Sequence, residues 1–124
     1  MIMSEGNGLF DPSALLGAAK RRFATVEIQD LGKVRVRSLT ELERGRIEAG
    51  MLDKKGHLSG SRMIDFKSRM IVECVVDHDG NQVFATKDVE RIKQQDSKTT
   101  NALFDAIQAH VGMSDEDVES IEKN

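Results

Sequence analysis

The sequence contains no tryptophan and no tyrosine, and its five phenylalanines are its only aromatic residues. A hydrophobic core must therefore be built from Leu, Ile, Val, Met and Ala, which favours helix packing over a β-sandwich. The single proline, Pro12, points in the same direction because helix interiors exclude proline. With 124 residues, 39% of them hydrophobic, the chain is long enough for one domain and too short for two independent cores.

Other absences restrict the cellular setting. Cys74 is the only cysteine, so an intramolecular disulfide is excluded and nothing indicates an oxidising compartment. The first ten residues have neither the basic nor the apolar region of a signal peptide, and no window approaches the roughly 18 apolar residues of a membrane span. We therefore expect a soluble cytoplasmic protein without membrane contact.

Clustered positive charge is also scarce. The chain has 18 basic and 21 acidic residues, a net charge of -3, and its one compact basic run is Lys20-Arg21-Arg22. Non-specific nucleic-acid binding depends on clustered Lys and Arg that neutralise phosphates. Residues 114–124, "SDEDVESIEKN", are plainly acidic. This balance disfavours nucleic acid as a partner.

The N-terminal part predicts an arm followed by a short helix. Residues 1–10 are rich in glycine and polar residues, which is typical of a flexible arm, and we place a single globular domain over residues 11–124. Asp11 suits an N-cap and Pro12 the first helical position. The helix would carry Leu15 and Leu16 on its apolar side, with the basic run in its last turn complementing the helix dipole.

From Thr25 to Leu39 the pattern changes to a period of two. Apolar and polar residues alternate in two runs that are joined by the glycine-containing residues 30–32, which predicts a β-hairpin. The apolar positions are Val26, Ile28, Val34 and Val36. Glu27 is expected to pair across the strands with Arg35 or Arg37, which would contribute about 0.2–1 kcal/mol.

Helix signals dominate the remainder. Thr40 and Glu43 fit a capping box that starts a helix ending near Gly50. Residues 53–61 contain two glycines and two serines without periodicity and predict a mobile loop. Further helices are expected around Met63–Cys74, after a Thr86 cap, from 96–97 to Gly112, and from Ser114. The predicted fold is α+β and mostly α-helical, with the N-terminal β-hairpin packed on four to five short helices.

The motif Asp77-His78-Asp79-Gly80 is the first place to look for chemistry. In an EF-hand alignment with Gly80 at position 6, Val75 and Thr86 occupy positions 1 and 12, where calcium ligands are needed. Zinc needs three or four ligands, and the chain offers one cysteine and three scattered histidines, which are His57, His78 and His110. We therefore predict no metal, no cofactor and no catalytic residue, and interpret the motif as a turn between a helix and the core.

Methionine and leucine near the predicted loop are candidates for an adaptable binding surface. Met63 and Met70 share one stripe of the predicted helix, and Leu52 precedes the loop. Methionine tolerates varied partners, so these three residues are the candidate contacts to a client protein. The alternative is that the two methionines only fill the core.

Three segments together carry a resemblance to a known family. These are "SLTELER", "MIVECVVDHDGNQVFATKDVERI" and "NALFDAIQAHVGMSDEDVESIEKN". In their order and spacing, the region from Val26 to Asn124 is similar to the tail assembly chaperones of long-tailed, siphovirus-like phages and prophages.

The resemblance implies a non-enzymatic protein that binds the tape measure protein in the host cytoplasm and supports polymerisation of the tail tube. It also implies self-association, absence from the finished virion, and in many members a frameshifted longer form that contacts the tail tube protein. No catalytic residue is assigned. Two alternatives stay open: a tail-completion or connector protein that is retained in the virion, and a host regulatory or interaction protein.

Overall fold

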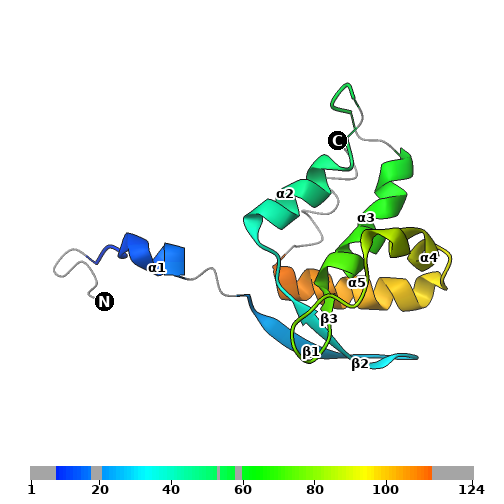
Figure 1. Ribbon diagram of the computed structural model, residues 1–124, viewed down its shortest axis with the longest axis horizontal. Coiled ribbons are helices and arrows are strands. Elements are labelled where there is room, and N and C mark those ends of the chain that lie inside the picture. Colours follow the sequence, from blue (N-terminus) through cyan, green and yellow to red (C-terminus); the bar gives the residue numbers. More distant parts are fainter. Residues whose placement is uncertain (1–7, 18–20, 53, 58–59, 113–124) are drawn as a thin grey trace.

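The protein folds into a small three-stranded sheet and a set of helices, and the predicted α+β class is confirmed. The computed structural model describes residues 8–17, 21–52, 54–57 and 60–112. Their elements, of which all but η1 are labelled in Figure 1, are α1 Pro12–Gly17, β1 Phe23–Ile28, β2 Gly32–Arg37, α2 Glu41–Ala49, α3 Gly60–Cys74, β3 Val75–Val76, the 3-10 helix η1 Thr86–Asp88, α4 Val89–Lys93 and α5 Ser97–Val111.

The sheet has the order β1-β2-β3, and both pairs are antiparallel. The predicted hairpin is confirmed, but the expected pairing of Glu27 with Arg35 or Arg37 is wrong. The observed register places Glu27 opposite Lys33, and Arg35 opposite Thr25. The strand β3 was not expected either, because its two valines continue the apolar run of α3; they are buried and pair with Arg35 and Val36 of β2.

The Asp77–Gly80 motif forms the predicted turn. One carboxylate oxygen of Asp77, Oδ1, accepts hydrogen bonds from the backbone N–H groups of Asp79 at 2.9 Å and Asn81 at 3.0 Å. Those donors favour the charged carboxylate and lower the pKa of Asp77. Gly80 has a φ of 87°, and an added Cβ there would lie 3.3 Å from the Phe23 ring. The motif therefore holds the chain reversal after β3.

The predicted capping box of α2 and the predicted glycine stop of α5 are confirmed. In α2 the backbone N–H of Glu43 donates to the Thr40 hydroxyl at 3.2 Å, and the N–H of Thr40 donates to the Glu43 carboxylate at 2.9 Å. In α5 the Asp96 side chain accepts from the Lys98 N–H at 3.1 Å. Gly112 then ends α5 in the left-handed region, with φ 80°.

Two other predictions need correction, and two further predicted segments lie at least partly outside the described residues. Thr86 is not a cap: it begins η1, and the Asp88 carboxylate accepts from the Ala85 N–H at 2.8 Å, so the aspartate satisfies the donor at that end. The predicted 53–61 loop is shorter, since α3 already begins at Gly60. Residues 1–7 of the predicted arm, and the helix predicted from Ser114, lie outside the described residues.

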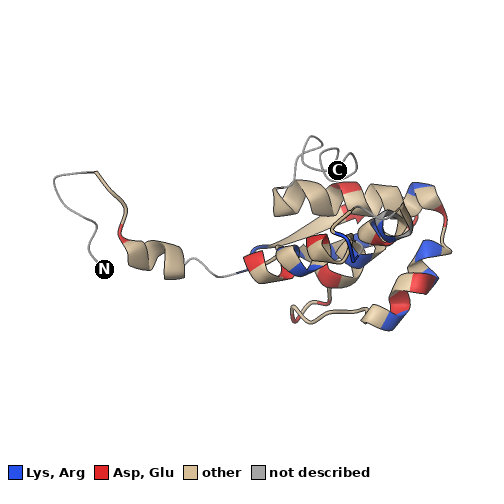
Figure 2. Ribbon diagram, turned by 90° about the horizontal axis from the view of Figure 1, so that it is seen from above, with Lys and Arg blue, Asp and Glu red and all other residues tan. Residues whose placement is uncertain are grey.

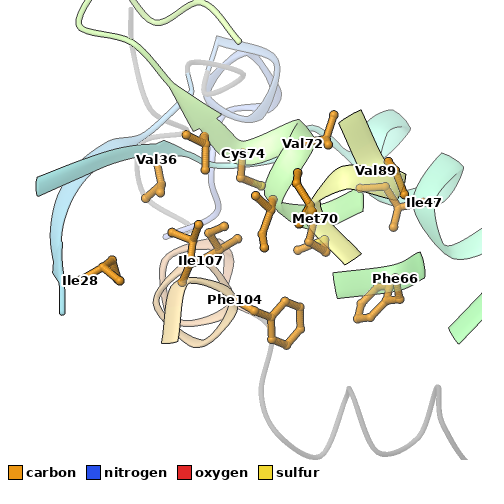
Figure 3. Close-up of a cluster of buried hydrophobic side chains, with 14 of the residues drawn as sticks. Ile28, Val36, Ile47, Phe66, Met70, Val72, Cys74, Val89, Phe104 and Ile107 are labelled. Carbon is orange, nitrogen blue, oxygen red and sulfur yellow. The ribbon is translucent and has the colours of Figure 1, made fainter. Parts of the chain in front are cut away.

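The core lies where α3 packs against α4 and α5, and where α5 packs against β1 and β2 (Figure 3). Phe66 of α3 and Phe104 of α5 meet edge to face, with ring centroids 5.7 Å apart. Met70, Cys74 and Ile107 fill the centre and are at most 1% exposed. Burial raises the pKa of the Cys74 thiol to about 12, so this side chain is a small apolar core residue, as its place on the stripe indicates.

The helix α1 stands apart from the other elements in both ribbon views (Figures 1 and 2). Its predicted start is confirmed, because the Asp11 carboxylate accepts from the Ser13 N–H at 2.9 Å. Its predicted end is wrong: α1 stops at Gly17, before Arg21 and Arg22, so these two residues do not complement its dipole. They make contacts with the domain instead.

Candidate interaction surface

The N-terminal segment, residues 8–17, exposes large apolar side chains. Leu9, Phe10, Leu15 and Leu16 are 63%, 60%, 68% and 79% exposed, and no residue of α1 is buried. The helix carries no charged residue, whereas the helices of the domain carry both signs (Figure 2). Single exposed apolar residues are ordinary, but a contiguous group indicates a contact surface. We call residues 8–17 the apolar arm.

Arg21 ties the chain that follows the apolar arm to the domain. Its guanidinium donates to both carboxylate oxygens of Glu43, with an Nη1–Oε1 distance of 2.7 Å, and also to the Ser38 carbonyl at 3.1 Å. This fork-to-carboxylate geometry is the strong form of the arginine–carboxylate pair. It lowers the pKa of Glu43 to about 2 and raises the pKa of Arg21.

Arg22 makes a second attachment through its backbone. Its N–H donates to the Ser38 hydroxyl at 2.8 Å, and its carbonyl accepts from the Ser38 N–H at 2.8 Å. The same carbonyl lies 2.9 Å from Nε2 of His110, in the last turn of α5. The root of the apolar arm is therefore fixed to β2, α2 and α5 together.

Arg37 extends this charge network into the interior. It is 8% exposed, and its Nε donates to the Glu73 carbonyl at 2.8 Å. Its Nη2 lies 3.3 Å from the Glu73 carboxylate and 3.7 Å from that of Glu43. An unpaired buried charge is costly, and here each guanidinium meets carboxylate oxygens. The network joins β2, α2 and α3.

Two further apolar side chains are exposed near the end of α2 and the start of α3. Leu52 is 40% exposed and Ile64 65% exposed. The Arg62 guanidinium donates to the Leu52 carbonyl at 2.7 Å and the Gly50 carbonyl at 3.3 Å, which holds the two segments together. We call Leu52 and Ile64 the α2–α3 patch.

The three predicted client-binding residues do not lie on one surface. Leu52 is at the surface in the α2–α3 patch, while Met70 is 1% exposed in the core, which is the alternative weighed for it. The side chain of Met63 lies outside the described residues. Client contact by Leu52 stays a prediction, and Met70 is inaccessible in this conformation.

A small cleft opens between α2, α3 and the start of η1 and α4. It encloses about 90 Å³, and both charged and aliphatic side chains line it. The charged and polar ones are Arg46, Arg69, Glu73 and Thr86, and the aliphatic ones are Ile47, Val72 and Val89. Because the cleft combines cations with an apolar floor, it suits an acidic group attached to an aliphatic one.

The residues that first suggested chemistry lie apart from these surfaces. Nε2 of His78 lies 3.4 Å from Oδ1 of Asp79, and the two side chains are 91% and 66% exposed on the outside of the turn. Within the part of the chain that the structure describes, no three His, Cys, Asp or Glu side chains gather closely enough to hold a metal ion. None of the described helices combines the length and the apolarity that crossing a bilayer requires.

A solved structure with the same fold is that of the bacteriophage HK97 tail assembly chaperone. The match has a TM-score of 0.58 and 17% sequence identity, and it covers 80% of this chain and 96% of that chain. The chain shares the fold of that chaperone. The resemblance noted in the sequence is thus confirmed at the level of the fold. Neither the models of known protein families nor the curated proteins gave a match.

The apolar arm is the surface that sequence reasoning missed, since Leu15 and Leu16 were assigned to the apolar side of a helix and not considered as a contact surface. A signal was available. The chain is 31% charged, yet residues 6–19 contain one charged residue, Asp11. A helix of only six residues that ends at Gly17 is also too short to be stable without a partner for its apolar side.

Proposed function

We propose that the protein is a non-enzymatic tail assembly chaperone of a phage or prophage, and that its client is the tape measure protein. The observation that carries the proposal is the fold, because the match spans nearly all of the HK97 tail assembly chaperone. Fold alone does not fix function, so the surface must also suit the task. A chaperone of this kind needs an accessible apolar surface on a well-packed, charged domain.

The apolar arm and the α2–α3 patch support this requirement. Both expose leucine or isoleucine side chains that a long, apolar, helical client can bury, and the arm holds Leu9, Phe10, Leu15 and Leu16 within ten residues. Burying one such side chain stabilises a complex by about 1.5–3 kcal/mol. Loss of two leucines from the arm should therefore weaken client binding by at least about tenfold.

In the proposed role the protein acts in the host cytoplasm, associates with itself, and leaves before the virion is complete. A frameshifted longer form would bring the tail tube protein to the same client. Detection of the chain in purified virions by mass spectrometry would instead support a structural tail protein.

Co-expression with the tape measure protein of the same phage or prophage tests the proposal. The wild-type chain should keep the client in the soluble fraction, and the double variant Leu15→Asp/Leu16→Asp should lose most of this effect. Leu31→Asp is the matched control, since Leu31 is 51% exposed but lies on the β1–β2 turn. If client solubility is the same with and without the wild-type chain across several client fragments, the proposed function is wrong. If the wild-type chain keeps the client soluble and the arm variant does so equally well, the client binds to another surface of the protein.

A further inference from the structure

Residues 113–124, which follow α5, hold most of the excess negative charge of the chain. Five of the 21 acidic residues and one of the 18 basic residues lie there, so this segment has a net charge of -4 and residues 1–112 have +1. Two aliphatic residues, Val118 and Ile121, are set among the acids. The segment therefore presents aliphatic side chains that carboxylates flank.

The cleft between α2 and α3 offers the complementary chemistry. Among the described residues, no carboxylate or hydrogen-bond acceptor meets the guanidinium of Arg46. Arg69 has one distant partner, Asp65, at 3.9 Å. The one acid in the lining, Glu73, is already engaged by Arg37 at 3.3 Å. Two arginines thus line the cleft together with three buried aliphatic side chains.

The segment also starts close to this cleft. His110, in the last turn of α5, contacts the Arg22 carbonyl, and the neighbouring Arg21 is paired with Glu43 in the first turn of α2. Arg46 lies three residues after Glu43, which places it one turn further along α2. Figure 1 shows the end of α5 below the start of α2. Twelve extended residues reach at most about 40 Å, far more than a few helical turns.

We propose that residues 113–124 bind in the α2–α3 cleft of their own chain, with an aliphatic side chain on the cleft floor and the flanking carboxylates on Arg46 and Arg69. In this state the segment covers a cleft that Arg46 and Arg69 line. The inference does not rest on the proposed chaperone function.

Paramagnetic relaxation in the full-length chain tests the proposal. A nitroxide is attached at Ser120→Cys; Cys74 can stay, because it is fully buried and its pKa is raised to about 12. We expect the methyl signals of Ile47, Val72 and Val89 to broaden selectively. The broadening should disappear at about 1 M salt, where the screening length falls to about 3 Å.

Matched variants separate charge recognition from chance proximity. Arg46→Gln together with Arg69→Gln should reduce the ratio of bound to free segment by about two- to thirtyfold, since each exposed pair is modest. Asp117→Asn with Glu119→Gln should give the same loss without any change in the domain. Arg44→Gln, which removes a cation from the Arg44–Glu48 pair of α2, should leave the broadening unchanged.

Three results would overturn the proposal. The first is broadening that is absent from the cleft or centred on another surface. The second is broadening that persists in both the arginine and the carboxylate variants. The third is cleft broadening of equal size when the nitroxide and the isotope label are on different copies, because the segment would then bind between chains.

Discussion

Replacement of Glu43 by glutamine tests whether the Arg21–Glu43–Arg37 network stabilises the domain. The pKa of Glu43 lies at about 2 instead of 4.5, which corresponds to about 3 kcal/mol of stability at neutral pH. The side chains of Glu43 and Arg21 retain 17% and 27% exposure, so solvent screens part of this interaction. We therefore expect Glu43→Gln to lower the free energy of unfolding by about 2 kcal/mol. Glutamine keeps an oxygen that can accept the Thr40 N–H, so the helix cap is not the group under test.

The pH dependence gives the sign of the effect. A carboxylate whose pKa is lower in the folded state stabilises the fold above its unfolded pKa, here 4.5, and this contribution is lost as the pH falls through about 2. The difference in stability between wild type and Glu43→Gln should thus be largest at neutral pH and shrink steadily below pH 4.5.

Urea unfolding followed by far-ultraviolet circular dichroism is the suitable assay, because the chain has no tryptophan or tyrosine for fluorescence. Glu48→Gln is the control: the Arg44–Glu48 pair on the same helix is 2.9 Å long but has side chains 36% and 40% exposed. Its loss should change stability by less than about 0.5 kcal/mol. The reasoning fails if Glu43→Gln costs no more than Glu48→Gln, or if its effect is the same near pH 2 as at neutral pH.

A pair of glycine substitutions tests the turn, and thiol labelling tests the core. Gly80→Ala should destabilise by about 1–3 kcal/mol in the same urea assay, because φ is 87° and the new methyl group meets an aromatic ring at 3.3 Å. Gly45→Ala, in a helix and with nothing within 4 Å, should instead stabilise by about 0.5–1 kcal/mol; equal effects would contradict the strain argument. The Cys74 thiol, fully buried and with its pKa raised to about 12, should react with a thiol reagent orders of magnitude more slowly in the native than in the urea-unfolded protein. Rapid labelling of the native protein would show that the end of α3 opens locally.

Local signals in the sequence were sufficient for much of the fold. The Thr40–Glu43 box and the Gly112 stop each involve residues close together in the chain, and the structure has both. The Asp77 turn is also local, because its carboxylate binds N–H groups two and four residues ahead.

Long-range contacts explain what was missed. β3 exists because β2 lies beside Val75 and Val76, and no local pattern reveals that neighbour. Arg21 was assigned to the end of α1, yet its partner Glu43 is 22 residues away, and Arg37 meets Glu73 across 36 residues. Met70 was predicted to contact a client but lies in the core, for a related reason. An apolar stripe on a helix can face either the core or a partner, and the stripe itself does not distinguish the two.

The double attachment of Arg21 and Arg22 limits the volume that the apolar arm can reach. Three residues separate Gly17 from Arg21, and the four residue steps between these two positions span about 14 Å at most. Under the proposed function, a client bound by the arm would therefore be confined near the domain, where the effective concentration for a second contact is in the millimolar range. Under that confinement, even a weak second contact at the α2–α3 patch adds to the first, and the combined avidity can exceed either affinity by about 10²–10⁴. If the proposed function holds, lengthening the connection with no contact residue changed would weaken the binding of the client.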